Sequence, residues 1–242
     1  MMDEVKLCNL HTHMLYGVDD GAGDPGEMHR MMDSAYQSGV RVICMTPHYN
    51  PAYFDTPREA TVRHFAAAVE YAKGKYPDLR LCLGNEMYYY GSSVEDILGG
   101  LCFTLNKTRS VLVEFGPLDD SSAIRSGVSR LVTSGFHPVV AHVERYADIR
   151  RKTDNVRSLI ERGARIQVNA ASVAGKYGFI TKSYVMSLIR KGLVDVVADD
   201  SHNTTDKKVC LRDAYDAVEK RFGTNTARDL FWNNPMRILH GE

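Results

Sequence analysis

Histidine and carboxylate side chains stand directly after most of the short apolar runs in this chain. Nine such positions are candidate metal ligands: His11, His13, Asp19 or Asp20, His48, Glu86, Glu114, His142, Asp199 or Asp200, and His202. Nitrogen and oxygen donors without thiolates suit Mn²⁺, Fe²⁺ or Zn²⁺ in a hydrolytic site and do not suit a structural zinc. Nine donors exceed what one ion takes, so the number favours two or three ions that share a carboxylate.

The elements that must position these residues are strands alternating with helices. Seven runs rich in Val, Ile and Leu predict strands at 5–10, 40–46, 79–83, 110–115, 138–141, 165–168 and 193–198. Helix starts are predicted at Asp24 and Thr56, each followed by Pro and then by an acid at the third position. Weaker helix starts are predicted at Thr153 and Thr181. Glycines that suit helix ends stand at Gly39, Gly163 and Gly192.

Apolar strands alternating with helices favour a parallel sheet whose faces are covered. Seven units in 242 residues predict an α/β protein with a closed or nearly closed barrel, as a single domain over 1–242. A doubly wound open sheet is the alternative.

Successive candidate ligands lie about 30 residues apart, roughly one βα unit. Parallel topology brings the ends of all strands to one rim, so residues distant in sequence are expected to meet there, including Asn169 after the sixth strand. Cations at the rim would offset the repulsion among the carboxylates.

Two further features near these positions could contact a substrate. Arg145 follows His142 by three residues, and a guanidinium there suits bidentate phosphate binding, whereas the alternative is a surface salt bridge with Glu144 or Asp148. The tyrosines at 88–90 follow Glu86 and suit either an aromatic wall for a ring-bearing substrate or ordinary core packing.

Composition excludes several classes of protein. Thirty basic residues balance thirty acidic ones, which argues against a protein that binds nucleic acid through the phosphates. The chain contains no run of 18 apolar residues, so no membrane span is predicted. The first residues, Met1-Met2-Asp3-Glu4, lack the basic start of a signal peptide, so a cytoplasmic protein is expected.

The cysteines also favour a protein of the reducing cytoplasm. Five cysteines, an odd number without a CxxC pair, predict buried reduced thiols and no disulfide framework. None of them precedes an arginine by six positions, so the phosphate loop of cysteine-dependent phosphatases is missing.

Several motifs resemble the PHP (polymerase and histidinol phosphatase) superfamily, and more narrowly its bacterial protein-tyrosine phosphatases of capsule and exopolysaccharide operons. The similarity runs from about residue 7 to 239. The motifs are His11-Thr12-His13, Val18-Asp19-Asp20-Gly21, Thr46-Pro47-His48, Glu86-Met87-Tyr88-Tyr89, Leu112-Val113-Glu114-Phe115, His142-Val143-Glu144-Arg145-Tyr146 and Asp199-Asp200-Ser201-His202.

The resemblance implies a distorted seven-stranded (β/α)7 barrel, the PHP fold, with three divalent metal ions, Mn²⁺ first and Fe²⁺ or Zn²⁺ as alternatives. One ion would be held by His11, His13, Glu86 and Asp200. A second would share Glu86 and be held by Glu114 and His142, and a third by Asp20, His48 and His202. This assignment selects the second acid of each Asp-Asp pair.

The resemblance also implies catalytic residues. Arg145 matches the phosphate-binding arginine of the family. A second arginine is expected shortly after the last ligand, where this chain has Asp206-Lys207-Lys208. Lys207 can supply the charge there but not the fork-like contact of a guanidinium.

The expected reaction is metal-assisted, in-line attack of water on phosphotyrosine. The expected partner is a phosphotyrosine protein, in the family a bacterial tyrosine kinase that regulates capsule or exopolysaccharide synthesis, and no nucleic acid is expected. Alternatives are a small-molecule phosphoesterase such as histidinol phosphatase, and a weakly catalytic regulator that binds phosphotyrosine. A polymerase-associated nuclease is disfavoured because neither a polymerase domain nor a basic excess is present.

Overall fold

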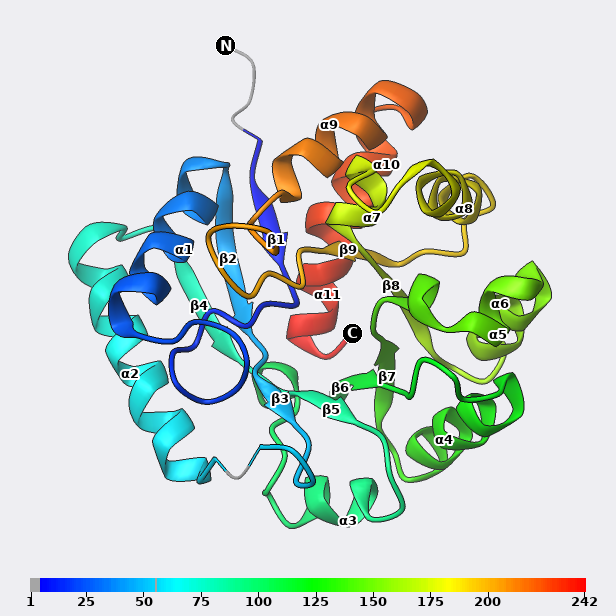
Figure 1. Ribbon diagram of the computed structural model, residues 1–242, viewed down its shortest axis with the longest axis horizontal. Helices are drawn as coiled ribbons and strands as arrows, with labels where there is room; N and C mark the ends of the chain where they lie inside the picture. The colour runs from blue at the N-terminus through cyan, green and yellow to red at the C-terminus, as the bar shows by residue number, and fades with distance from the viewer. Residues whose placement is uncertain (1–4, 55) are drawn as a thin grey trace.

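The structure is a computed structural model that describes residues 5–54 and 56–242, so the acidic start Met1-Met2-Asp3-Glu4 lies outside it. Over those residues the chain alternates strands and helices around a curled sheet (Figure 1). The strands are β1 (Leu7–Asn9), β2 (Val40–Met45), β3 (His48–Tyr49), β4 (Arg80–Leu83), β5 (Glu86–Tyr88), β6 (Ser110–Glu114), β7 (His137–Val140), β8 (Arg165–Asn169) and β9 (Val196–Ala198).

The strands form two parallel sheets with the orders β1-β2-β4 and β3-β5-β6-β7-β8-β9. Each of the seven predicted strands is present, while the short β3 and β5 were not predicted as separate strands. The ladder breaks after β2 at Thr46 and Pro47, where proline has no N–H to donate, and the chain resumes as β3 in the second sheet. A parallel bridge between Thr12 and Ser201 joins the segments after β1 and β9. The fold is therefore an α/β fold with a curled parallel sheet, and the seven-stranded count stays a prediction.

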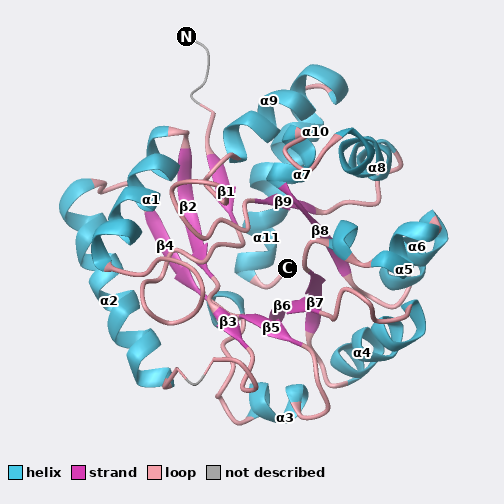
Figure 2. Cartoon of the chain, in the orientation of Figure 1, coloured by secondary structure: helices cyan, strands magenta, loops and turns pink. Residues whose placement is uncertain are grey.

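Helices cover the outer face of the strands (Figure 2). They are α1 (Pro25–Gln37), α2 (Arg58–Lys75), α3 (Ser93–Leu98), α4 (Ser121–Thr133), α5 (Ala147–Arg151), α6 (Thr153–Ile160), α7 (Ala170–Ala174), α8 (Phe179–Arg190), α9 (Leu211–Phe222) and α10 (Thr224–Arg228), whereas α11 (Asn234–His240) lies in the middle of the ring of strands. Short turns η1 (Leu105–Lys107), η2 (Val143–Arg145) and η3 (Asp229–Asn233) complete the chain. No helix in the described part is both long and apolar enough to span a membrane.

The predicted helix starts are only partly right. Asp24 caps α1 as predicted, because its carboxylate accepts the N–H of Glu27 at 2.8 Å. The prediction that Thr56 caps α2 was wrong. The helix begins at Arg58, and the Thr56 hydroxyl instead donates to the carbonyl of Val18 at 2.7 Å. That hydroxyl therefore ties one loop to another and is not available to the helix.

The other helix ends depend on backbone conformation. The helix predicted to start at Thr181 begins earlier, at Phe179, because Gly178 before it is extended with a positive φ. Gly39, Gly163 and Gly192 all have positive φ between a helix and the following strand, which confirms their predicted place.

Two apolar clusters flank the strands. The larger one lies between the strands and the outer helices, and the smaller one lies inside the ring of strands. The smaller cluster includes Cys8, Cys44 and Cys82, which are buried as predicted, and Cys102 and Cys210 are free and buried as well. Helix α11, red in Figure 1, fills the middle of the ring with Ile238 and Leu239.

Helix α11 is tied to the amino-terminal end of β6. The Ser110 hydroxyl at the start of β6 donates to the carbonyl of Ile238 at 3.2 Å. Asn106 in the preceding turn donates its amide to the carbonyl of Leu239 at 2.9 Å. The carboxyl ends of the strands, on the other side, are therefore left free to build a site.

Candidate metal centre

The carboxyl ends of the strands bring all nine predicted ligands together. His11 and His13 follow β1, Asp20 lies in the loop before α1, and His48 and Glu86 begin β3 and β5. Glu114 ends β6, His142 follows β7, and Asp200 and His202 follow β9. The ligand atoms of eight of them fall into three overlapping groups, each with all its atoms within 4.8 Å of one another, and His142 borders one of these groups.

The first group consists of His11, His13, Glu86 and Asp200, all of them buried. The Oε2 atom of Glu86 lies 3.2 Å from Nε2 of His11 and 3.3 Å from Nε2 of His13. The Oδ1 atom of Asp200 lies 3.5 Å from each of the same two nitrogens. Two imidazoles and two carboxylates thus face one point.

The second group consists of His48, Glu86 and Glu114. His142 borders it, with Nε2 2.7 Å from Oε1 of Glu86 and 3.5 Å from Oε1 of Glu114. Glu86 therefore belongs to both groups: its Oε2 atom faces His11, His13 and His48, and its Oε1 atom faces His142.

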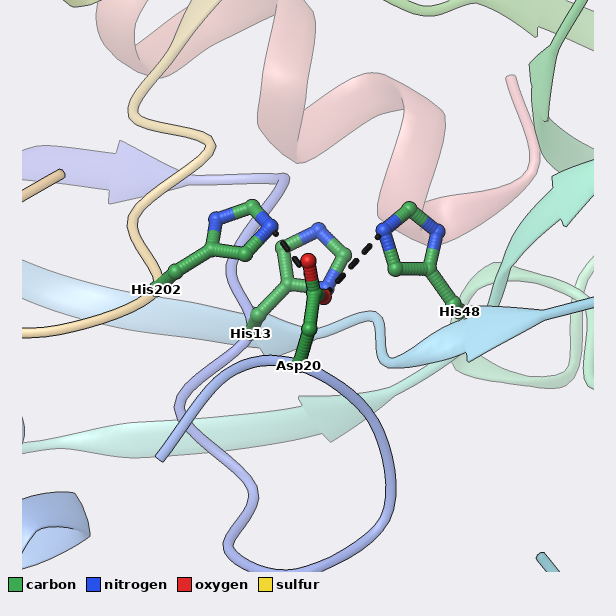
Figure 3. Close-up of side chains that lie close together, drawn as sticks. All are labelled: His13, Asp20, His48 and His202. Carbon is green, nitrogen blue, oxygen red and sulfur yellow. Dashed lines mark ion pairs between the residues drawn. The ribbon is translucent and has the colours of Figure 1, made fainter. Parts of the chain in front are cut away.

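The third group consists of His13, Asp20, His48 and His202. Figure 3 shows Asp20 reaching from its loop between the imidazoles of His48 and His202, with His13 behind it. The Oδ1 atom of Asp20 lies 3.5 Å from Nε2 of both His48 and His202. The expected set did not include His13 here, so this imidazole lies between two groups.

The donor atoms fit cations better than they fit one another. Oε2 of Glu86 is buried and has no hydrogen bond among the described residues, although Nδ1 of His48 lies 3.1 Å away and two other imidazole nitrogens are close. The Nε2 atoms of His11 and His13 face each other at 3.1 Å. Lone pairs that converge without donors between them are the arrangement of a metal site, because a buried carboxylate left alone is costly.

Burial and neighbouring charges shift the pKa values of these residues. Burial and the Glu86 charge raise the pKa of Glu114 to about 7. Burial and the charge of His13 lower the pKa of His202 to about 4, and the same causes lower that of His48. Burial alone would raise the pKa of Glu86, but His11 and His48 hold it well below its usual range. The shifts of His48, His202 and Glu86 favour neutral imidazoles and an ionised carboxylate, the protonation states that bind a cation, whereas Glu114 would lose its proton when a cation binds.

The structure distinguishes the two acids of each Asp-Asp pair. Asp19 lies behind the centre, where its Oδ2 atom is 2.7 Å from Nδ1 of His13 and accepts the N–H of His48 at 2.9 Å. Asp199 accepts from the Asn9 amide and from the N–H of Cys210, each at 2.8 Å. The acids that face the grouped imidazoles are Asp20 and Asp200.

One residue that positions the centre was missed in the sequence. The Gln167 side-chain oxygen accepts the N–H of His142 at 2.8 Å and lies 3.2 Å from Nδ1 of His11. Its amide donates to Asn169 at 2.8 Å, and Asn169 donates to Asp200 at 2.7 Å. The available signal was two polar residues at alternate positions of a buried strand, since alternate residues share one face.

A pocket of about 210 Å³, the site pocket, opens above the centre. It is lined by Asp20, His48, Asn50, Phe54, Tyr88, Glu114, Arg145, Asp200, His202 and Lys207. Arg145 points its Nη1 atom at Asp200 and Glu114, at 3.8 and 4.0 Å, and among the described residues it forms no ion pair with Glu144 or Asp148. Both cations suggested by the sequence, Arg145 and Lys207, thus border one cavity together with the carboxylates.

The three consecutive tyrosines have different environments. Tyr88 lines the site pocket, Tyr89 packs its ring against Phe115 with centroids 5.2 Å apart, and Tyr90 donates its hydroxyl to Asp96. The aromatic wall suggested by the sequence is therefore limited to one of the three.

Comparison with known proteins gives a consistent result. Residues 7–240 match the family described as capsular polysaccharide synthesis, CpsB/CapC. The tyrosine-protein phosphatase CpsB of Streptococcus pneumoniae is 33% identical over 239 residues, which cover 96% of this chain and 98% of that protein. The tyrosine-protein phosphatase YwqE of Bacillus subtilis strain 168 is 32% identical over 221 residues, covering 90% of this chain and 86% of YwqE.

A solved structure is similar over nearly the whole chain. It comes from work on YwqE of Bacillus subtilis and CpsB of Streptococcus pneumoniae, described as metal-dependent tyrosine phosphatases. It superposes with a TM-score of 0.87 and 29% identity, over 98% of this chain and 95% of the other.

Proposed function

This chain belongs to the capsular polysaccharide synthesis CpsB/CapC family, and from that membership we infer that it is a metal-dependent protein-tyrosine phosphatase. The enzyme is a hydrolase of phosphotyrosine. The observation that carries this function is the site pocket, in which Arg145 faces clustered imidazoles and carboxylates at the rim of a fold shared with those phosphatases.

We propose three divalent ions, with Mn²⁺ first and Fe²⁺ or Zn²⁺ as alternatives, held by the eight grouped residues together with His142. The first group supplies His11, His13, Glu86 and Asp200. Glu86 is shared with a second ion beside Glu114 and His142, and the third group supplies Asp20, His48 and His202. Divalent cations at this place would lower the pKa of water and offset charge on the phosphoryl oxygens.

The side chains around the pocket have separate roles in this proposal. The Arg145 guanidinium binds two phosphoryl oxygens and turns them towards the centre, and its neighbours Asp200 and Glu114 hold it there. Lys207 adds a second positive charge at the pocket wall without a fork-like contact. Tyr88 and Phe54 flank the space for the aromatic ring of the substrate.

The substrate we propose is phosphotyrosine on a protein, in particular on a bacterial tyrosine kinase that regulates capsule or exopolysaccharide synthesis. The family description, capsular polysaccharide synthesis, supports this choice. The five free, buried thiols support a reducing cytoplasm as the location.

The proposed functional unit is the whole chain, 1–242, as one distorted seven-stranded barrel. Counting β2 with β3, and β4 with β5, as two bent strands gives seven. The bridge between Thr12 and Ser201 supports closure between the first and last strands.

The test is hydrolysis after chelation and return of Mn²⁺. Hydrolysis of a phosphotyrosine peptide and of histidinol phosphate is measured with three proteins: the native chain, the Glu114→Gln variant and the control variant Glu161→Gln. Glu161 is exposed, so its substitution should leave the activity unchanged. We expect kcat/KM to be higher for the peptide, and Glu114→Gln to lower it at least about a hundredfold, the scale on which removal of one charge-stabilising group acts.

Three results would contradict the proposal. Full activity of Glu114→Gln would contradict the metal centre. Preference for histidinol phosphate would favour a small-molecule phosphoesterase. Tight peptide binding without turnover would favour a regulatory protein.

A further inference from the structure

A second cavity, of about 270 Å³, lies beside the site pocket; we call it the side pocket. Phe54, Arg58, Leu101 and Phe103 are among its lining residues, and most of the lining is apolar. The two pockets share His48 and Phe54. The side pocket therefore adjoins the site pocket.

The walls of the side pocket are held by side-chain hydrogen bonds. Asn85 is buried, donates its amide to the carbonyl of Pro47 at 2.8 Å and accepts the N–H of Phe103 at 2.8 Å. On the other side, Thr56 is tied to the carbonyl of Val18. The cavity is thus formed before any ligand arrives, which lowers the entropic cost of binding.

The residue between the two pockets is Phe54. Its ring stacks on the imidazole of His48, with centroids 5.4 Å apart and planes 4° from parallel. One aromatic side chain therefore divides the space above the metal centre from the side pocket, and a substrate can contact both of its sides.

The chemistry of the lining favours an aromatic ligand. The Arg58 guanidinium lies 4.6 Å from the centre of the Phe103 ring, and no carboxylate is among the described lining residues. Rings stack on phenylalanine and on guanidinium planes, whereas a lysine or arginine would meet a like charge. Leu101 is 55% exposed, so its apolar surface is available to be covered.

The size of the cavity limits what it can hold. Pockets for whole small molecules have volumes of roughly 300–1,000 Å³. The side pocket falls just below that range, which fits a single side chain rather than a second substrate molecule.

We propose that the side pocket binds an aromatic side chain of the substrate, two residues from the phosphotyrosine. Residues two apart in an extended peptide point to the same face and lie roughly 7 Å apart, which suits adjoining pockets. This inference rests on the proposed phosphatase function and adds a sequence preference to it. Leu101 and Phe103 determine that preference without touching the reacting atoms.

The experiment uses phosphotyrosine peptides that carry Phe or Ala at the second position before or after the phosphotyrosine. The ratio of kcat/KM for the Phe and Ala peptides is measured in the Mn²⁺-loaded full chain. We expect a ratio of about two to twelve at one of the two positions, because an aromatic contact contributes about 0.5–1.5 kcal/mol. The difference should lie in KM, since the contact is made equally in ground and transition states.

Two variants in the wall and one control complete the design. Leu101→Asp should bring the ratio close to one, and Leu101→Ala should lower it less. Leu98→Asp is the matched control, because this leucine is 70% exposed and does not line the pocket, so the native ratio should remain. Taking the ratio within each variant cancels any general effect on activity or folding.

The outcomes separate this inference from the function on which it rests. A ratio of one at both positions in the native chain, or an unchanged ratio in Leu101→Asp, overturns the side-pocket proposal and leaves the phosphatase standing. Failure of the Mn²⁺-loaded native chain to hydrolyse any of the peptides or p-nitrophenyl phosphate overturns both.

Discussion

Two candidate ligands adopt a backbone conformation that is unusual for residues other than glycine. His142 has φ 30° and Asp200 has φ 53°, both in the left-handed region. Such residues persist only where the surroundings hold them, at a cost of order 1–3 kcal/mol each. Gln167 and the Asn169 amide supply that support by bonding the His142 N–H and the Asp200 carboxylate. The strained backbone at His142 and Asp200 is thus what directs their side chains towards the candidate metal centre.

Asp19 provides a test of positioning at the residue scale. Asp19→Asn removes the charge that holds Nδ1 of His13, so the imidazole should present Nε2 less well. We expect Mn²⁺ affinity to fall about 10- to 100-fold, measured by isothermal titration calorimetry. Asp216→Asn serves as the control, because the Asp216 carboxylate pairs with Arg212 at the surface, away from the centre. Equal Mn²⁺ affinity in Asp19→Asn and the native chain would show that the contact has no positioning role.

At the scale of elements, the short strands β3 and β5 matter because each begins with a candidate ligand. His48 and Glu86 pair in parallel register, which places their side chains next to each other at the sheet edge. Neither strand exceeds three residues, so local propensity cannot reveal them. Their pairing depends on breaks after β2 and β4 that turn the chain into the second sheet.

Helix α11 is the element that fills the ring of strands. Leu239→Ala should destabilise the protein by about 2–5 kcal/mol, because this side chain is 2% exposed inside a close-packed cluster. Urea unfolding monitored by circular dichroism measures the loss, and His240→Ala, exposed on the same helix, should change stability by less than about 0.5 kcal/mol.

Activity distinguishes the two ends of the ring. Since α11 contacts the amino-terminal end of β6, kcat of Leu239→Ala should stay near the native value at temperatures where it is folded. A large loss of kcat in the folded variant would mean that α11 also shapes the metal centre.

At the scale of the whole molecule, the metal centre is a concentration of charge in a protein with formal charge zero. Burial and the neighbouring acids act in opposite directions on His13 and His142, and the acids prevail, so both pKa values are raised. Without cations, protons on these imidazoles offset part of the carboxylate charge. Cations bound only by the folded state would therefore add to its stability.

Metal removal should lower the melting temperature while leaving the fold intact. At Mn²⁺ a hundredfold above its Kd, the folded state gains about 2.7 kcal/mol per site. Thermal unfolding followed by circular dichroism in EDTA and after Mn²⁺ addition measures the shift. Far-UV spectra should match, because neither apolar cluster contains a candidate ligand.

Calcium at the same concentration is the control. A site rich in imidazole favours Mn²⁺ over Ca²⁺, which prefers oxygen ligands, so Ca²⁺ should raise the melting temperature less. A melting temperature that does not respond to Mn²⁺ would contradict a folded-state metal centre.

The sequence by itself determined the α/β class, the positions of seven strands and the identity of seven of the nine candidate ligands, and it left open which acid of each Asp-Asp pair takes part. It did so because apolar runs mark buried strands, and parallel topology sends their carboxyl ends to one rim. Asp24 at α1 and the helix-ending glycines were equally readable, since their signals are local.

Only the tertiary structure decided which donors share a point, that Asp20 and Asp200 face the centre, and that Gln167 supports it. It also placed α11 inside the ring and the side pocket beside His48. These features depend on contacts between residues far apart in the chain. Their geometry is set by packing and strand register, which local patterns of residue type do not encode.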